Sequence, residues 1–292
     1  MTELRFRSAN APTAGGTLRL RIPEQSTGIP MLLLHGGPGG TDYLSKFLGD
    51  QISLAGYTPV GAIQRGSPGS TTTGPFTVQR FVEDVEDIRK FLGVPRLAIF
   101  GHSWGGFLAT CYAAIYPDAV ERLILVCPMG IRSGWRDEFD RVMFERIPNE
   151  LKEHYLALGE QARLERDPQK RYALLFQRAQ IHVFSYYAPS KRAGQPGLAH
   201  LSMDVHEALQ ASALEWVERP GWEEGLMQLT CPRFLIVGTE DSIPVSVARD
   251  YHELLPNLPI EFLEECGHFP FFEQPVEFRS ALQTALTSSV SA

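Results

Sequence analysis

The sequence has no excess of basic residues. Its 292 residues include 27 lysines and arginines against 34 aspartates and glutamates, which gives a formal net charge of −7. A mildly acidic chain lacks the positive surface that attracts a phosphate backbone. It also has no run of about five like charges that would form a charged tail. We therefore expect no nucleic-acid partner.

Long apolar runs are absent as well. The first apolar run, residues 31–34, is short and is followed closely by glycine and proline, unlike the apolar core of a signal peptide. No stretch approaches the roughly 20 apolar residues that a membrane span needs. The sequence therefore predicts a cytoplasmic protein without a membrane partner, and it leaves a homo-oligomer open.

Metal-binding patterns are missing too. The four cysteines are far apart and lack the C-x-x-C spacing of a zinc site. His200 and His206 are six residues apart, which does not match the i, i+4 pair of a helical metal site. We therefore expect no metal.

Short apolar runs and helical stretches alternate over most of the chain. Two runs near the N-terminus alternate apolar and polar residues, which is typical of antiparallel edge strands. Most later runs are wholly apolar, as buried parallel strands are, and the helical stretches between them imply right-handed crossovers. This pattern predicts an α/β fold with a mostly parallel, twisted sheet flanked by helices. The expected strands are residues 4–7, 18–22, 31–34, 59–63, 97–100, 123–127, 234–237 and 260–263.

The alternation stops in the middle of the chain. Between about residues 133 and 220 there is no clear strand, and helical stretches such as residues 168–183 dominate. We therefore predict one α/β core, formed by residues 1–130 and 221–292, which is split by a helical cap of residues 131–220.

A serine motif follows one of the predicted strands. The run GHSWGG, residues 101–106, stands between the strand 97–100 and a helix, and it fits the G-x-S-x-G nucleophile elbow. Such a sharp turn exposes the serine hydroxyl above the sheet and needs small neighbours at Gly101 and Gly105. The motif in this context predicts Ser103 as a nucleophile.

A glycine-rich loop follows another buried strand. The run HGGPGG, residues 35–40, comes directly after the strand 31–34. Acyl-transfer chemistry needs two preorganised N–H donors for the developing oxyanion. In this architecture one comes from such a loop and the other from the residue after the nucleophile. We assign them to the backbones of Gly37 and Trp104.

A serine nucleophile needs a base and an acid that orients it. With a nucleophile elbow, the chain order is serine, then acid, then histidine, each after a strand. Glu240 and Asp241 follow the strand 234–237, and His268 follows the strand 260–263. Because of its offset from the strand end we prefer Asp241 as the acid, and we predict the triad Ser103, Asp241 and His268.

The chain resembles the α/β-hydrolase superfamily over nearly its whole length, and within it the proline iminopeptidase branch. The resemblance implies the α/β-hydrolase fold, a cap over the site, no cofactor, and hydrolysis of a small amide or ester. That branch removes an N-terminal residue, often proline, from short peptides, so the expected partner is a small molecule or a short peptide. The motifs that carry it are HGGPGG (35–40), QRG (64–66), SWG (103–105), GTED (238–241), GH (267–268) and EQP (273–275).

Two alternatives stay open at this point. His102, before the nucleophile, is the residue common among esterases and lactonases, so a carboxylesterase, lactonase or thioesterase would use the same triad on a small acyl substrate. A non-hydrolytic member of the fold, either a ligand-binding receptor or a cofactor-free lyase, is the second alternative. Serine at position 103 disfavours an aspartate-nucleophile dehalogenase.

The resemblance also implies a carboxylate that holds the amine of the substrate. Burying an ammonium group without a partner is costly, so an acid should line the site. Glu215, near the end of the predicted cap, resembles the amine-binding glutamate of the family, and Glu207 is the alternative. We expect Phe269 and Trp216 to give the pocket an aromatic wall that suits a proline ring.

Overall fold

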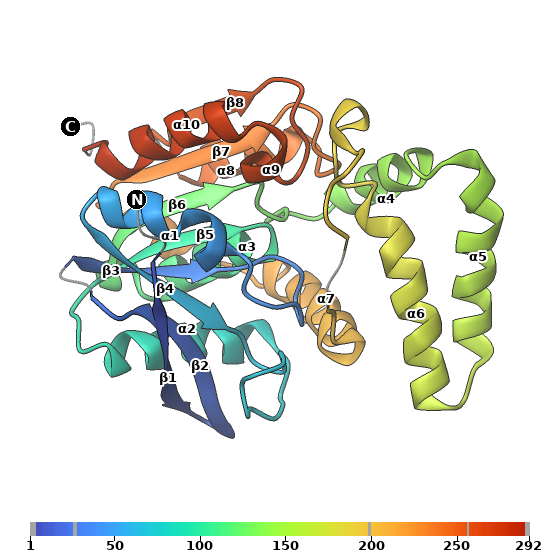
Figure 1. The fold of residues 1–292 in the computed structure, drawn as a ribbon. Helices are drawn as coiled ribbons and strands as arrows, with labels where there is room; N and C mark the ends of the chain where they lie inside the picture. The colour runs from blue at the N-terminus through green and yellow to red at the C-terminus, as the bar shows by residue number, and fades with distance from the viewer. Residues whose placement is uncertain (1–3, 26–27, 198–199, 256, 290–292) are drawn as a thin grey trace.

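The computed structural model describes residues 4–25, 28–197, 200–255 and 257–289, and an eight-stranded sheet lies at its centre (Figure 1). The strand order is β1-β2-β4-β3-β5-β6-β7-β8. The β1–β2 and β2–β4 pairs are antiparallel, and all other pairs are parallel. The predicted fold class is therefore confirmed. The strands are β1 (Phe6–Thr13), β2 (Gly16–Pro23), β3 (Ile29–Leu34), β4 (Tyr57–Ile63), β5 (Leu97–His102), β6 (Val120–Val126), β7 (Arg233–Gly238) and β8 (Ile260–Leu263).

Helices cover both faces of the sheet. Successive side chains of a strand point to opposite faces, so Leu32 and Leu34 of β3 lie in one apolar core while Met31 and Leu33 lie in the other. Burial on both faces explains why most positions of the central parallel strands are apolar. Helices α2, α3 and α8 pack on the first face, and α1 and α10 on the second. Their bounds are α1 (Leu44–Leu54), α2 (Val78–Phe91), α3 (Trp104–Ile115), α8 (Ser246–Leu254) and α10 (Pro275–Thr287).

Helix α2 shows how the sequence sets these elements. The hydroxyl of Thr77 accepts the N–H of Arg80 at 3.3 Å and so caps the first turn. Phe81, Val85 and Ile88 form a buried stripe at helical spacing. The stripe anchors the helix on the sheet.

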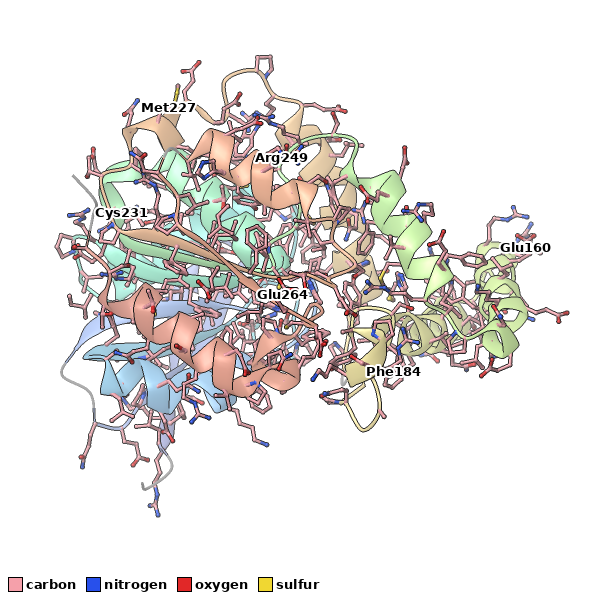
Figure 2. All side chains as sticks on the ribbon, turned by 90° about the horizontal axis from the view of Figure 1, so that it is seen from above. Glu160, Phe184, Met227, Cys231, Arg249 and Glu264 are labelled. Atoms are coloured by element: carbon pink, nitrogen blue, oxygen red, sulfur yellow. The ribbon has the colours of Figure 1, made fainter. Side chains whose placement is uncertain are left out.

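A helical insertion, α4–α7, lies between β6 and β7. Helices α4, α5 and α6 extend beyond the sheet, as Figure 1 shows, and Figure 2 places Glu160 of α5 at the outer end. Helix α7 instead returns to the core, where Val205, Leu209 and Ala213 are buried. None of the described residues between β6 and β7 forms a strand. The helices are α4 (Trp135–Glu145), α5 (Asn149–Leu164), α6 (Pro168–Val183) and α7 (Met203–Val217), with η2 (Pro189–Lys191) and η3 (Glu224–Gln228) beside them.

Two further short helices lie in the core: η1 (Pro117–Ala119) precedes β6, and α9 (Pro270–Glu273) precedes α10. In the part of the chain that the structure describes, no helix combines the length and the apolar character needed to traverse a lipid bilayer.

Candidate active site

Ser103 occupies a strained turn between β5 and α3. Its backbone has φ 56° and ψ −122°, a left-handed conformation that side chains rarely adopt. A Cβ at Gly101 would overlap the carbonyl of Gly105, and one at Gly105 would overlap the carbonyl of Leu34. The two glycines therefore let the strand, the helix and the neighbouring β3 meet at this turn, which leaves Ser103 partly exposed.

His268 and Asp241 form a buried pair at the same edge of the sheet. Strands β7 and β8 are parallel neighbours, so the loops that follow them meet. Nδ1 of His268 lies 2.9 Å from Oδ2 and 3.0 Å from Oδ1 of Asp241. The carboxylate can only accept, so Nδ1 carries the proton and Nε2 remains available as a base. Asp241 also accepts the N–H of Ile243 at 2.9 Å, which holds the carboxylate in place.

A chain of three hydrogen bonds joins the elbow to this base. Nε2 of His102 lies 2.7 Å from the carbonyl oxygen of His268, and Nδ1 of His102 lies 2.5 Å from the hydroxyl of Tyr43. The N–H of Gly36 donates to that hydroxyl at 2.8 Å. A carbonyl only accepts, so Nε2 of His102 is protonated and Nδ1 accepts from Tyr43.

Burial favours the neutral forms that this chain of bonds requires. It lowers the pKa of His102 well below its usual range, and the nearby His268 adds to the effect. Burial also raises the pKa of the Tyr43 hydroxyl, which keeps its proton for donation. The bonds therefore hold together the glycine-rich loop (residues 35–40), the turn at Ser103 and the loop that carries His268 (residues 266–273, called the base loop below).

The glycine-rich loop lies directly against Ser103. A Cβ at Gly36 would come within 2.8 Å of the Ser103 Cβ. The Gly36 N–H is bonded to Tyr43, so it is not available to an oxyanion. The next N–H along the loop belongs to Gly37, whose φ is +61°. This N–H bonds to no described residue. The N–H of Trp104 begins α3 and has no intrahelical acceptor. Both groups assigned to the oxyanion therefore remain free to donate.

The side chain of Gln64 bridges the glycine-rich loop and the start of α3. Its Nε2 donates to the carbonyl of His35 at 2.9 Å, and its Oε1 accepts the indole N–H of Trp104 at 2.9 Å. The neighbouring Arg65 is buried and holds the carboxylate of Asp84 with two bonds of 2.8 and 2.7 Å. These contacts give a structural role to the QRG run, residues 64–66.

Glu273 organises the base loop, which sequence reasoning did not anticipate. Its buried carboxylate accepts the N–H groups of Gly267, Phe269 and Ala188, each at 2.8 Å. The first two flank His268, and the third belongs to the insertion. The only sequence signal was the EQP run quoted for the family resemblance.

A family model described as the alpha/beta hydrolase fold matches residues 29–275. The chain belongs to the α/β-hydrolase fold family. It is 28% identical over 288 residues to the proline iminopeptidase of Lactobacillus delbrueckii subsp. bulgaricus, covering 91% of this chain and 92% of that one. It is 24% identical to the proline iminopeptidase of Heyndrickxia coagulans, with 94% and 96% covered. The predicted resemblance is therefore confirmed.

Solved structures agree with this assignment. The crystal structure of VinJ has a TM-score of 0.73 and 22% identity, with 97% of this chain and 99% of that chain covered. A proline iminopeptidase-related protein of Thermus thermophilus has a TM-score of 0.67 and 25% identity, covering 98% of this chain and 99% of the other. The likeness to VinJ concerns the fold alone.

In this α/β hydrolase, aromatic rings surround the base. The ring of Tyr186, from the insertion, lies 4.7 Å from the ring of His268. The backbone N–H of His268 also donates to the backbone carbonyl of Tyr186 at 3.0 Å. Phe269 is partly exposed, and its ring centroid lies 5.2 Å from that of His268. Phe269 is thus beside the base, where we expected a substrate contact, and the insertion touches the base directly.

The structure does not bring Glu215 or Trp216 to this edge. Helix α7 starts at the glycine-rich loop, where the Ser202 N–H donates to the Gly39 carbonyl at 2.9 Å. At about 1.5 Å per residue, position 216 lies roughly 20 Å further along. Trp216 lines a depression with Ile115 at the far end of α3. Glu215 is exposed on α7.

The alternative acid, Glu207, also lies on α7. It is exposed and pairs with Arg171 of α6 at 2.9 Å. This pair lies outside the set of contacts around Ser103. The helical phase of α7 presents its apolar side to the core, so these acids face solvent.

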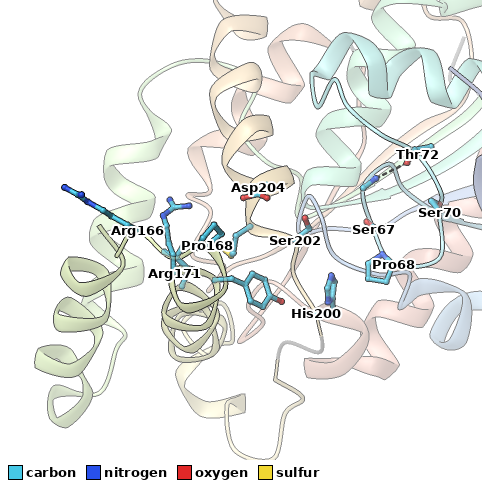
Figure 3. A pocket seen from close by; sticks show the side chains of 14 residues that line it. Ser67, Pro68, Ser70, Thr72, Arg166, Pro168, Arg171, His200, Ser202 and Asp204 are labelled. Carbon is cyan, nitrogen blue, oxygen red and sulfur yellow. Dashed lines mark hydrogen bonds between the residues drawn. The ribbon is translucent and has the colours of Figure 1, made fainter. Parts of the chain in front are cut away.

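A cavity of about 580 Å³ lies next to the glycine-rich loop (Figure 3). Arg166 and Arg171 stand on one side of it, and Ser67 and Pro68 on the other. Ser202, which is bonded to the loop, belongs to its wall. Ser103 is not among its lining residues, so this cavity adjoins the candidate site without containing the nucleophile.

Cys127 lies beneath the acid–base pair. One ligand atom each of Cys127, Asp241 and His268 lie within 4.8 Å of one another. Burial raises the pKa of the Cys127 thiol well above its usual range, and a protonated thiol is a poor metal ligand. This arrangement fits packing under the site, and the expected absence of a metal stays a prediction.

Proposed function

We propose that this α/β hydrolase is a serine hydrolase that cleaves a small amide through an acyl-enzyme, as an aminopeptidase of the proline iminopeptidase type. The observation that carries the proposal is the buried His268–Asp241 pair, at 2.9 Å, beside the strained turn of Ser103. The similarity to proline iminopeptidases supports the substrate class.

In this mechanism the Nε2 of His268 takes the proton of Ser103 as the hydroxyl attacks the substrate carbonyl. Asp241 holds the imidazole through Nδ1 and stabilises the imidazolium that forms. The N–H groups of Gly37 and Trp104 bind the oxyanion. His268 then protonates the leaving amine, and water attacks the acyl-enzyme with His268 again as base.

In this proposal the helical insertion covers the site as a cap. The contact between Tyr186 and His268 supports this role, because it brings the insertion against the base. The bond between Glu273 and the Ala188 N–H joins the same segment to the base loop. A cap in this position would exclude water and shape the substrate pocket.

A second candidate function is hydrolysis of an ester, lactone or thioester by the same triad. The observation that favours it is the position of the acids on α7, since Glu215 and Glu207 are both exposed. An aminopeptidase must hold a cationic amine, whereas an esterase needs no such anchor.

The nucleophile is tested by Ser103→Ala. We expect covalent labelling by a fluorophosphonate probe to disappear and kcat to fall on the order of 10⁴-fold or more. Ser242→Ala is the control, because Ser242 is buried next to Asp241 without being the nucleophile. Labelling of the Ser103 variant at the rate of the unaltered protein would overturn the assignment.

The substrate class is tested with three compounds: proline naphthylamide, its N-acetylated form and a 4-nitrophenyl ester. An aminopeptidase prefers the free amine, and N-acetylation should lower kcat/KM by about 100-fold or more, the cost of losing a charged anchor. Equal rates with and without the free amine, together with faster ester cleavage, would favour the second candidate.

A further inference from the structure

Arg136 stands where the insertion leaves the core, close to the elbow. The Met129 N–H donates to the carbonyl of Ser103 at 3.1 Å. The next residue, Gly130, carries no side chain, and a Cβ there would overlap the ring of Trp135. Trp135 and Arg136 are the first two residues of α4. The first turn of α4 is therefore packed on the segment that is bonded to the nucleophile.

Aromatic rings lead from this guanidinium to the base. The Cζ of Arg136 lies 4.8 Å from the ring centroid of Trp135 and 5.7 Å from that of Phe139. Phe139 lies 5.9 Å from Tyr186, and Tyr186 lies 4.7 Å from His268. A row of aromatic rings thus lies between the guanidinium of Arg136 and the imidazole of His268.

Helix α7 also contacts Arg136. Arg136 donates a hydrogen bond to the Gln210 side chain. The residue before this helix, Ser202, donates its N–H to the carbonyl of Gly39 at 2.9 Å. Gly39 belongs to the glycine-rich loop, so α7, which contacts Arg136 through Gln210, is also bonded to the loop assigned to the oxyanion.

The charge of Arg136 has no close counterion. Among the described residues no carboxylate forms an ion pair with it. Asp140, one turn further along α4, is largely exposed, and partial burial of its carboxyl group raises its pKa despite the attraction of Arg136. Burial and the field of nearby cations lower the pKa of His182 to about 4 and that of His206 below its usual range. Both imidazoles are therefore neutral at neutral pH.

A half-buried guanidinium without a counterion favours an anionic ligand, because two charge-assisted bonds can replace its lost hydration. We propose that Arg136 binds a carboxylate at the end of the substrate remote from the scissile bond, with the rings of Trp135, Phe139 and Tyr186 against its apolar middle. This inference rests on the proposed function. It assigns the substrate class as small amides or esters that carry a free carboxylate.

Two matched pairs of substrates test the proposal and distinguish the side on which the carboxylate lies. Prolyl-alanine against prolyl-alaninamide places the charge on the leaving group. The 4-nitrophenyl monoester of glutaric acid against 4-nitrophenyl pentanoate places it on the acyl group. We expect the charged member of one pair to have a kcat/KM about tenfold higher, mainly through KM, as one charge-assisted contact supplies.

Arg136→Met keeps the apolar stem over the rings and removes the charge. We expect the preference for the charged substrate to fall to about onefold, mainly through a higher KM for that substrate. Arg136→Lys should retain part of the preference, because it keeps the charge without the planar fork. Arg132→Gln is the matched control, since Arg132 is exposed and pairs with Glu253 at 2.7 Å.

A measurement without turnover separates this proposal from the proposed function. Glutarate should slow fluorophosphonate labelling of Ser103 in the unaltered protein, more than neutral glutaramide does, and the difference should vanish in Arg136→Met. Labelling that depends on Ser103 but responds equally to both compounds, or equally in both proteins, would overturn the carboxylate site alone. Labelling that does not depend on Ser103 would instead overturn the proposed function.

Discussion

The sheet edge that carries Ser103, Asp241 and His268 and the helical insertion are held in place in different ways. At the edge, formed by the loops 35–40, 101–106, 238–241 and 266–273, polar side chains are buried and bonded to one another or to backbone groups. His102 is 0% exposed, His268 2% and Glu273 4%. In the insertion, by contrast, the 16-residue helix α6 buries only Val183.

This difference indicates separate tasks. Many buried hydrogen bonds hold reacting groups at fixed distances, which acyl transfer requires. A helix with little buried surface is stabilised by few contacts and tolerates substitution. We therefore expect changes at the edge to lower kcat, and changes in the insertion to act on stability or substrate choice.

Among changes outside the proposed triad, the largest effect is expected from Glu273→Gln. The amide NH2 cannot accept, so it leaves a buried backbone N–H without a partner, at a cost of about 1–3 kcal/mol for each group. The base loop should loosen, and kcat should fall by roughly 100-fold. Urea unfolding together with steady-state kinetics measures both effects. Glu277→Gln, at an exposed site on α10, is the control. An unchanged kcat would show that the loop is held by other contacts.

Tyr43→Phe should have a smaller effect at the same edge. The variant removes the acceptor for the Gly36 N–H and the donor to His102, while the ring stays. Each of the two lost bonds contributes about 0.5–1.5 kcal/mol net, so we expect kcat to fall about tenfold with little change in KM. The control is Tyr116→Phe, whose ring packs on Tyr112 at the far end of α3. A change in KM alone would contradict a positioning role.

His182→Gln tests how a buried histidine of the insertion makes the stability of the protein depend on pH. The pKa of His182 is about 4 in the folded protein against 6.5 ordinarily. Between these values the unfolded chain binds more protons, so the free energy of unfolding decreases as the pH falls from 6.5 toward 4. In the variant, the free energy of unfolding should depend less steeply on pH, by up to about 1.4 kcal/mol per pH unit. Urea unfolding at several pH values measures it, with the exposed His154→Gln as the control. Identical slopes would contradict the prediction.

Glu215→Gln should have the smallest effect. Because Glu215 is exposed on α7, we expect kcat/KM for a free-amine substrate to change less than about twofold, in the range of an ordinary surface substitution. Kinetics on proline naphthylamide measures it. A rise in KM of tenfold or more would restore the amine anchor that the family resemblance implies.

The order of the elements could be predicted because the parallel strands are mostly apolar and the crossovers between them are short. Asp241 and His268 lie together, as the chain order predicts, since loops after neighbouring parallel strands end at one edge. The first strand was predicted to end at residue 7, yet β1 continues to Thr13 because it pairs with β2 along its whole length. Helix α1 was not predicted, although Leu44, Leu48 and Ile52 recur at helical spacing and are buried.

The substrate-binding residues could not be predicted in the same way. Glu215 matches the family by its place in the chain, but the direction of α7 and its rotation about its axis decide what it faces. Tyr43 and His102 are 59 residues apart, and no local pattern indicates that they meet. Arg136 gains its position only because α4, α6 and α7 pack together.

By itself, the amino-acid sequence determined the sheet, the strained serine turn and the succession of acid and histidine, because apolar periodicity and glycine placement act over a few residues. Tertiary structure alone decided that Tyr186 of the insertion lies beside His268 and that Arg136 meets Gln210 of α7. Those outcomes depend on how distant helices pack, and packing is a property of the whole chain.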